Sequence, residues 1–516
     1  MPTPTMNAAE FHDKVLGCWL GKNVGGTLGA PFEWKRQVND VSFYTQDLTG
    51  DPAPNDDLDL QLAWLIALEE KGLDVTAHRL AEYWLMYVTP HWSEYGICKA
   101  NLRAGLAPPL SGSFGNVYKD SCGAYIRSEI WACIAPGDPR AAARYAYEDA
   151  IVDHGDGEGT HAEVFCAALE AAAFVEPDLH ALIAIALSYI PEGCGVARCV
   201  RSLVAWHGEG KTWREARDLV LEHYRGMAAP WCADAMSEEE KRKGLADGPL
   251  GWDVPSNIGI TVLGLLWGAG DFAKTQTICV NCGEDTDCTA ATAGSIFGII
   301  HGAAGIPEAW IKPIGRKIKT ACLNLGELGF YGAQVPQDVD ELTDRVLRVQ
   351  QRVQLQTTWP KLRVTADGPT DLSALDRASL AAGKFRSELY ANHGRAVYRF
   401  DFFRASVDYG PGGPTTRGAA TPEGKVVRVT LDNTYKQQRP IHMRCHVPPG
   451  LSVSPTDAAG ISLVWGQGGD AFVVDLTFRL NGPATAPSYR AVVELTSPGH
   501  AAVMHVPIVL LNTGIS

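Results

Sequence analysis

The sequence has no long run of Lys and Arg and no uninterrupted apolar stretch long enough to cross a membrane. Its 516 residues contain 45 Lys and Arg against 59 Asp and Glu, which gives a formal net charge of −14. A negative surface repels nucleic-acid backbones and anionic lipids, so neither a nucleic acid nor a membrane is expected as a partner. The longest apolar stretch, residues 289–307, contains Ser295 and His301 and predicts a buried helix.

The N-terminus also lacks the charged start and apolar core of a secretory signal. The 13 cysteines are odd in number and have no small-domain spacing, which favours reduced thiols and a cytoplasmic protein. Cys279 and Cys282 form a CxxC pair, but no second pair follows at zinc-finger spacing. The cysteines therefore predict neither a disulfide framework nor a structural zinc site.

A chain of this length exceeds what one hydrophobic core usually supports, so two or three domains are expected. From about residue 10 to residue 350, apolar residues recur every three or four positions, which is typical of helices. The predicted helices are 58–70, 75–88, 141–151, 162–174, 179–189, 213–224, 261–268, 289–301 and 338–355. We therefore expect an all-α domain over residues 1–355.

After Thr357 the pattern changes to short alternating or β-branched segments separated by turns that contain Gly and Pro. The predicted strands are 426–432, 442–447, 461–464, 471–478, 489–495 and 502–511. Their spacing predicts an all-β, immunoglobulin-like sandwich over residues 360–516, and the run 410–414 predicts a loop. By analogy with other sandwiches we expect carbohydrate binding or a dimer contact here. Tyr390, Tyr398 and Trp465 are either sugar platforms or, more often for such residues, core.

Two segments far apart in sequence, 54–62 and 281–289, each place three acids at the start of an apolar helix. One interpretation is capping, since Asp or Asn at a helix N-terminus accepts hydrogen bonds from free N–H groups. A cap needs only one or two such side chains, however, and three acids repel one another. A divalent cation would offset that repulsion through carboxylate ligands. Capping explains each segment taken alone, whereas a shared metal site explains the two together.

The helix after the second acidic segment has glycine at positions 294, 298 and 302. Glycine in the middle of a helix costs about 0.5–1 kcal/mol, so packing must compensate for it. A face without side chains lets a neighbouring helix approach closely. We expect this face to hold the acidic segment against the core of the bundle.

Three separated stretches match motifs of a known family. Residues 25–33 are similar to its glycine-rich opening, residues 55–58 to its T-D-D-T turn, and residues 283–291 to its G-x-D-T-D-T-x-A-A turn. These stretches resemble the ADP-ribosylglycohydrolase family, and the resemblance covers most of residues 10–310. It implies a compact all-α bundle that binds two divalent cations, Mg²⁺ or Mn²⁺, beside the ribose of a substrate.

Carried over position by position, the resemblance implies a binuclear site whose ligands come from both acidic segments. Asn55 occupies the place of the family's first Thr and can offer an amide oxygen. Cys288 stands where a Thr ligand often lies, and a thiol is a poor ligand for Mg²⁺, so either Thr289 substitutes or that place is lost. The implied ligands are Asn55, Asp56, Asp57, Asp285, Asp287, Cys288 and Thr289.

The resemblance also implies catalytic and substrate-binding residues. Glu33 matches an acid near the scissile bond and is the first candidate for general acid or base, with an exposed loop acid as the alternative. Asp57 is the second catalytic candidate. Gly26 replaces the Asp that the family usually has in this opening. The implied substrate-binding residues are His154, Gly155, Gly157 and Glu129.

The predicted function is a metal-dependent glycosidase, a hydrolase of N- or O-glycosyl bonds that cleaves the C1 bond of a ribose-like furanoside. An ADP-ribosylated substrate is the first expectation, and a small glycoside or nucleoside in sugar catabolism is the alternative. A third possibility, of another class, is a catalytically inactive, crystallin-like binding protein. The partner is then a small molecule or an ADP-ribosylated substrate, and a homo-oligomer is possible.

Overall fold

The computed structural model describes residues 3–225, 251–323, 334–357, 361–434, 438–463 and 471–513. The chain folds into two compact units. The first unit comprises residues up to Gly96 together with Val117–Tyr390, and the second comprises Ile97–Asn116 together with the residues from Ala391 onward. Some predicted positions lie outside the described residues. They include residue 360 of the predicted sandwich, residue 464 of a predicted strand and Trp465 of the predicted aromatic platforms.

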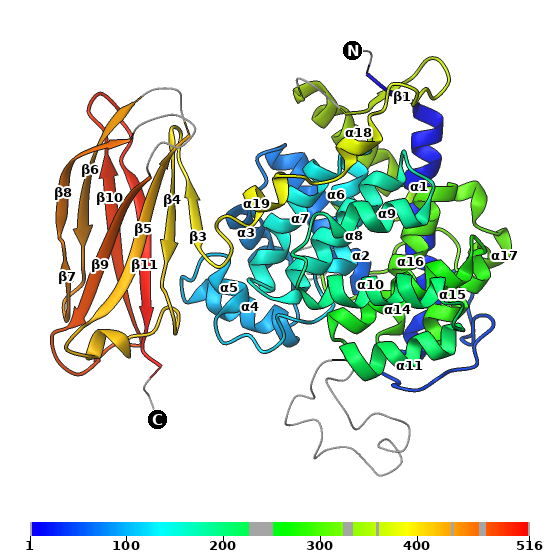
Figure 1. Cartoon of the computed structure of the whole chain (residues 1–516), viewed down its shortest axis with the longest axis horizontal. Helices are drawn as coiled ribbons and strands as arrows, with labels where there is room; N and C mark the ends of the chain where they lie inside the picture. The colour runs from blue at the N-terminus through cyan, green and yellow to red at the C-terminus, as the bar shows by residue number, and fades with distance from the viewer. Residues whose placement is uncertain are drawn as a thin grey trace, which may run out of the picture. The chain divides into compact units, whose positions relative to one another are not determined.

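The first unit is helical, as predicted (Figure 1). One helix runs from residue 213 to residue 224, and these are the bounds predicted from the periodicity. The helices of the first unit are α1 (Ala8–Gly29), α2 (Asp56–Lys71), α3 (Ala77–Tyr87), α6 (Glu129–Ile134), α7 (Pro139–Asp153), α8 (Glu158–Ala173), α9 (Leu179–Leu187), α10 (Gly195–Gly208), α11 (Trp213–Tyr224), α14 (Val254–Gly268), α15 (Phe272–Asn281), α16 (Thr286–His301), α17 (Glu308–Ile311), α18 (Val339–Gln356) and α19 (Phe385–Leu389). Helix α4 (Ser93–Arg103) begins in this unit and ends in the second.

Short polar side chains determine where many of these helices begin. Thr212 and Glu215 form a reciprocal capping box at the start of α11, and Asn7 accepts a hydrogen bond from the Ala9 N–H at the start of α1. Helix α14 begins seven residues before the predicted 261, because Pro255 occupies its first turn, where proline is tolerated. Further caps are Asp138, Asp178, Asp271 and Asp338.

Helices α1 and α16 pack against each other with their backbones in direct contact. A Cβ atom on Gly21 would lie 2.0 Å from the Gly294 carbonyl oxygen, and one on Gly17 would lie 2.6 Å from the Gly298 oxygen. Toward the other end, a Cβ atom on Gly25 would meet the Ala290 oxygen at 2.2 Å. The order of these contacts makes the two helices antiparallel. The close approach predicted for the glycine face of α16 is confirmed at positions 294 and 298.

Two features of this packing differ from the expectation. Helix α1 is absent from the predicted helices, because glycine at every fourth position leaves its buried face without the apolar side chains that periodicity detects. Gly302 lies beyond the helical glycine face. It caps α16 with a φ of 71°, and a Cβ atom there would meet the Asp13 carboxylate at 1.9 Å.

The second unit contains two antiparallel sheets, which agrees with the predicted sandwich. A five-stranded sheet has the order β3-β4-β5-β9-β7, and a four-stranded sheet has the order β11-β10-β6-β8. Strands β3, β4 and β7 were not predicted from the sequence. The strands are β3 (Ala396–Arg399), β4 (Phe403–Asp408), β5 (Lys425–Asn433), β6 (Arg439–His446), β7 (Leu451–Ser454), β8 (Asp457–Leu463), β9 (Phe472–Leu480), β10 (Ser488–Thr496) and β11 (Met504–Leu511). The predicted loop at 410–414 lies between β4 and β5.

Along the strands of the second unit, side chains that point into the core alternate with side chains that point outward. In β6, Ile441, Met443 and Cys445 point inward and are buried, while the residues between them are exposed. Leu106 and Leu110 join this core from the segment 97–116, which includes α5 (Leu110–Ser113). The segment 97–116, from the first quarter of the chain, therefore completes the sandwich unit. The sequence pattern changes from helical to strand-like at residues 355–360. In space, however, the helical unit extends to Tyr390.

Two of the three aromatic platform candidates lie in the described residues. Tyr390 belongs to the helical unit and packs edge-on against Tyr147, with ring centroids 5.4 Å apart. Tyr398 lies on β3 and packs against the sandwich core. Both positions support the core interpretation of these residues. A small parallel pair, β1 (Thr5–Asn7) with β2 (Arg363–Thr365), joins distant parts of the helical unit. Among the described helices, none has both the length and the apolarity that crossing a bilayer requires.

The contact between α1 and α16 predicts a large difference between two glycine-to-alanine substitutions. Gly21→Ala should destabilise the protein by about 1–3 kcal/mol or more, because its methyl group overlaps backbone that cannot move aside. Gly208→Ala, in α10, should be neutral or stabilising by up to about 1 kcal/mol, because nothing lies within 4 Å of its Cβ position. Urea unfolding of the two variants tests this, and equal stabilities would contradict the close packing.

Candidate metal centre

The packing of α1 on α16 brings the two acidic segments together. Glu33 lies just beyond the end of α1, and one oxygen each of Glu33, Asp285 and Asp287 lie within 4.8 Å of one another. A second group joins the start of α2 to the start of α16: donor atoms of Asp57, Asp287 and Cys288 also lie within 4.8 Å of one another. The Cys288 thiol donates a hydrogen bond to Asp57 Oδ1 at 3.3 Å. Asp287 therefore belongs to both groups.

Capping accounts for few of these acids. Asn55 caps α2, because its Oδ1 accepts a hydrogen bond from the Asp57 N–H at 2.8 Å. Asp56 and Asp57 lie inside that helix and are not needed for the cap. Asp285 occupies the N-cap position of α16, yet its side chain makes no capping hydrogen bond. Of the two interpretations, the geometry therefore favours a shared site over two independent caps.

The three central aspartates are buried and incompletely paired. Asp57 is 0%, Asp285 3% and Asp287 7% exposed. One oxygen of each, Asp57 Oδ2, Asp285 Oδ1 and Asp287 Oδ1, has no hydrogen-bond partner among the described residues. Burying an unpaired carboxylate is costly, and oxygen-seeking divalent cations provide the missing partner. These residues fit a bound divalent cation.

Burial and mutual repulsion raise the pKa values of the cluster. Burial, followed by the charges of Asp287 and Asp59, raises the pKa of Asp56 to about 7. Burial, with Asp287 and Asp56, raises the pKa of Glu33 to about 9. The pKa of Asp285 is also raised, first by burial and then by Asp287. Without a cation, these carboxyls therefore retain protons near neutral pH.

The third acid of each segment has a structural partner instead. Asp59 Oδ2 accepts hydrogen bonds from the N–H groups of Ala321 and Cys322, each at 2.6 Å. Glu284 pairs with the buried Arg36 at 3.0 Å. Asp59 thus holds a distant loop beside the start of α2, a role that the sequence analysis did not assign. The only available sequence signal was that three acids exceed the needs of a cap.

Much of the chain is similar to known proteins. Residues 7–355 match the protein family described as ADP-ribosylglycohydrolase. The chain belongs to the ADP-ribosylglycohydrolase family. It is 25% identical over 334 residues to ADP-ribosyl-[dinitrogen reductase] glycohydrolase of Rhodospirillum rubrum, which covers 61% of this chain and 94% of that protein. It is 32% identical over 68 residues to ADP-ribosylarginine hydrolase Tri1 of Serratia proteamaculans (strain 568), which covers 13% of this chain and 18% of that protein.

Two departures from the family's motifs are coupled in space. A Cβ atom on Gly26, where the family usually has Asp, would lie 1.8 Å from Asn55 Nδ2. Asn55, which replaces a Thr, therefore fills the space of the missing Asp side chain. The Thr289 hydroxyl donates to the Thr286 carbonyl of its own helix at 3.3 Å, and its predicted role as a substitute ligand stays a prediction. Cys288 itself faces Asp57.

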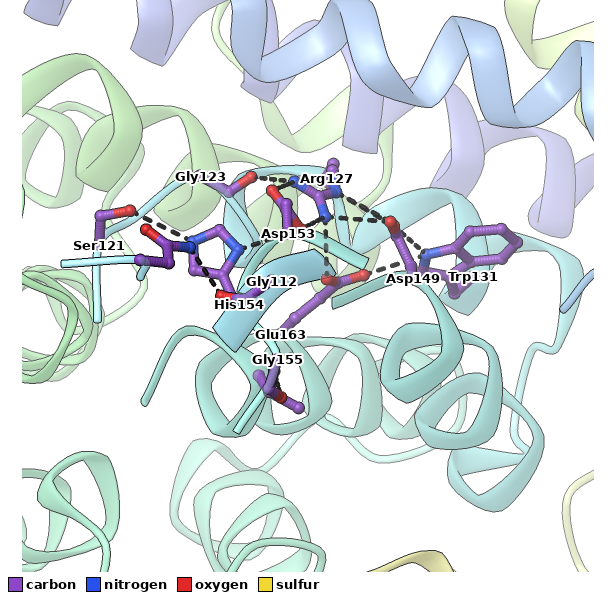
Figure 2. Close-up of polar contacts among 12 residues, drawn as sticks. Gly112, Ser121, Gly123, Arg127, Trp131, Asp149, Asp153, His154, Gly155 and Glu163 are labelled. Carbon is purple, nitrogen blue, oxygen red and sulfur yellow. Dashed lines mark hydrogen bonds and ion pairs between the residues drawn. The ribbon is translucent and has the colours of Figure 1, made fainter. Parts of the chain in front are cut away.

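His154 lies in a fully buried charged network, shown in Figure 2. Its Nδ1 lies 3.1 Å from Asp153, and its Nε2 lies 3.2 Å from the Ser121 hydroxyl. Arg127 is hydrogen-bonded to both Asp149 and Asp153. Burial alone would raise the pKa of Asp153, but Arg127 and then His154 outweigh it and lower the pKa to about 2. This network links the end of α7 to the segment around Ser121 inside the helical unit.

The glycines around His154 allow close packing of their loop. Gly155 has a φ of 52°, in the left-handed region that favours glycine. A Cβ atom on Gly157 would lie 2.2 Å from the Lys119 carbonyl oxygen. These contacts give Gly155 and Gly157 a packing role, and their predicted role in substrate binding stays a prediction.

The segment 121–123 connects this network to the acidic cluster. The Ser121 hydroxyl reaches His154, and the Gly123 carbonyl accepts a hydrogen bond from Arg127 at 2.5 Å. Between them, the Cys122 thiol lies within hydrogen-bonding reach of Asp285. Sequence analysis gave Cys122 no role, because a lone cysteine in a polar segment carries no signal of its spatial neighbours.

Glu129 lies next to the cluster but is already paired. Its two carboxylate oxygens accept hydrogen bonds from Lys22 Nζ at 2.7 Å and from Gln61 Nε2 at 2.8 Å, and all three side chains are buried. Burial raises the pKa of Asp57, and the positive charge of Lys22 offsets part of that rise. Glu129 thus positions a cation beside Asp57, and its predicted contact with substrate stays a prediction.

The raised pKa values predict how stability depends on pH. A carboxyl whose folded pKa lies above its unfolded value of about 4 binds more protons in the folded chain, so stability falls as pH rises between the two values. For Asp56 and Glu33 that window extends to about 7 and about 9. Excess Mn²⁺ should therefore raise the melting temperature over that in EDTA, and by more at about pH 8 than at about pH 6.

Differential scanning calorimetry with and without Mn²⁺ at each pH makes this measurement. Taking the difference at a fixed pH removes the contribution of His154 and of other groups outside the cluster. A Mn²⁺-induced shift that is zero, or that shrinks as the pH rises, would contradict the electrostatic description of the cluster.

Proposed function

We propose that this chain is a divalent-metal-dependent hydrolase that cleaves the bond at C1 of a ribose-like furanoside. The observation that carries the proposal is the pair of donor groups that meet at Asp287, with buried carboxylate oxygens that lack partners among the described residues. Asp56, Asp57, Asp285 and Asp287 are the proposed oxygen ligands of two cations, Mg²⁺ or Mn²⁺. Bound cations of this kind supply charge for binding ribose hydroxyls and lower the pKa of water toward neutrality.

The chain's own acids are proposed to stabilise charge and move a proton. Asp57 places negative charge close to the sugar ring, where positive charge develops in an oxocarbenium-like transition state. Glu33 is half-buried at the edge of the cluster and lies within 4.8 Å of Asp285 and Asp287. It is placed to transfer a proton to the leaving group, because it lies beside the proposed ligands and is not one of them. The donor atom that carries this step is a carboxyl oxygen of Glu33.

The first candidate substrate is an ADP-ribosyl group attached to an acceptor. Membership of the ADP-ribosylglycohydrolase family and the names of both relatives favour this choice. The second candidate is a small furanoside or nucleoside, and a specific observation favours it. Asn55 fills the space of the family's Asp at Gly26, which alters the lining beside the proposed ligands. An inactive, crystallin-like protein is disfavoured, because such a protein has no need for three buried aspartates whose donor atoms converge at Asp287.

Substitution of one proposed ligand tests the function. Asp285→Asn should lower turnover by about a hundredfold or more with little loss of stability, because it removes charge at the cluster while keeping the shape of the side chain. Asp271→Asn is the matched control: Asp271 is exposed, caps α15, and Asn is an equally good cap, so its activity should not change.

Both variants and the parent should be assayed on ADP-ribosylated protein, nitrophenyl furanosides and nucleosides, with and without EDTA. Loss of activity on one substrate class in both EDTA and Asp285→Asn identifies that class. Full activity of Asp285→Asn, or activity that resists EDTA, would overturn the proposed mechanism.

A further inference from the structure

The two donor groups of the cluster differ in chemistry. Glu33, Asp285 and Asp287 provide only oxygen atoms, whereas Asp57, Asp287 and Cys288 include a sulfur. Oxygen-only sites suit Mg²⁺ and Mn²⁺, and thiolate sulfur selects softer ions. One cluster thus contains a hard and a soft group of ligands joined at Asp287.

We propose that the two cation positions are not equivalent, and that Cys288 is a metal ligand that makes the position bounded by Asp57 and Asp287 select Zn²⁺, Fe²⁺ or Co²⁺ over Mg²⁺. The other position, bounded by the oxygen atoms of Asp285 and Asp287, takes Mg²⁺ or Mn²⁺, and Glu33 beside it keeps its proposed role in proton transfer. This inference rests on the proposed function and replaces Mg²⁺ or Mn²⁺ by a softer ion at one of its two cation positions. Binding releases one proton, since a Cys288 S–H bond is replaced by a sulfur–metal bond.

The position of Cys288 supports a ligand role over simple packing. Its sulfur is buried, with 7% of the residue exposed, and its thiol is directed at the carboxylate of Asp57, 3.3 Å away. A packed structural cysteine instead has apolar neighbours. A cation between the sulfur and the carboxylate would take the place of the shared proton.

The unpartnered oxygens point to the same position. Asp57 Oδ2 and Asp287 Oδ1 are buried and have no hydrogen-bond partner in the described parts of the chain. Together with the Cys288 sulfur they make three donors, and solvent or substrate can complete a four-coordinate shell. Cys122, which reaches Asp285, is the rival source of sulfur in this cluster.

Cobalt(II) bound to the full-length chain gives a direct readout, because a thiolate ligand adds an intense charge-transfer band in the near ultraviolet. The metal-free wild type should develop this band on titration with Co²⁺. Cys288→Thr, which restores the family's residue, should lose the band and bind Co²⁺ at least about tenfold more weakly. Its Mg²⁺ affinity should stay unchanged or rise, since Mg²⁺ prefers the hydroxyl oxygen. Calorimetric titration measures both affinities.

Cys445→Ser is the matched control, because Cys445 is also 7% exposed but lies in the core of the sandwich unit. It should keep the band and the Co²⁺ affinity. Cys122→Ser should also keep both. X-ray absorption on the zinc-loaded wild type provides a measurement that needs no variant, and it should detect one sulfur neighbour at about 2.3 Å.

The failures of this inference and of the proposed function are distinguishable. Two Co²⁺ ions bound without a sulfur band, or a band that survives Cys288→Thr but is lost in Cys122→Ser, would overturn the role of Cys288 and leave the hydrolase proposal standing. Failure of the wild type to bind any divalent cation would overturn both.

Discussion

Backbone contact between α1 and α16 determines where the acidic side chains lie. Because glycine recurs at every fourth position of α1, this helix lies directly on α16 along most of its length. At one end of the contact, the chain that leaves α1 runs beside the chain that enters α16, and the Trp34 N–H donates to the Glu284 carbonyl at 2.8 Å. Glu33 and Asp285 are brought together by this packing. A side chain on the glycine face would separate the helices and with them the cluster.

The same helical unit neutralises several of its other buried acids with cations of its own. Arg127 pairs with Asp149 and Asp153, and Lys22 pairs with Glu129. Such pairs offset the cost of burying charge. The cluster around Asp287 differs in that its donor atoms converge within 4.8 Å, and within the described residues one oxygen of each central aspartate has no partner. This convergence of buried carboxylates is the strongest physical reason to assign an external cation to the cluster.

The sequence predicted the fold class, the helical and sandwich regions and the two acidic segments, because these depend on local patterns. It could not predict that Gly26 leaves room for Asn55, that Cys122 reaches Asp285, or that Leu106 and Leu110 complete the sandwich core. Those contacts join residues far apart in the chain, and no periodicity records them. Helix α1 was missed for the opposite reason, since its glycine face is a packing signal rather than an apolar one.

The central claim is that one cluster, centred on Asp287, binds two cations. The most direct test is the number of Mn²⁺ ions bound per chain, measured by equilibrium dialysis with elemental analysis, for the wild type and for Asp287→Asn. The account predicts two ions for the wild type and weakened binding of both in the variant, since Asp287 belongs to both donor groups. A wild type that binds no Mn²⁺, or an Asp287→Asn variant that binds two ions as tightly as the wild type, would contradict it.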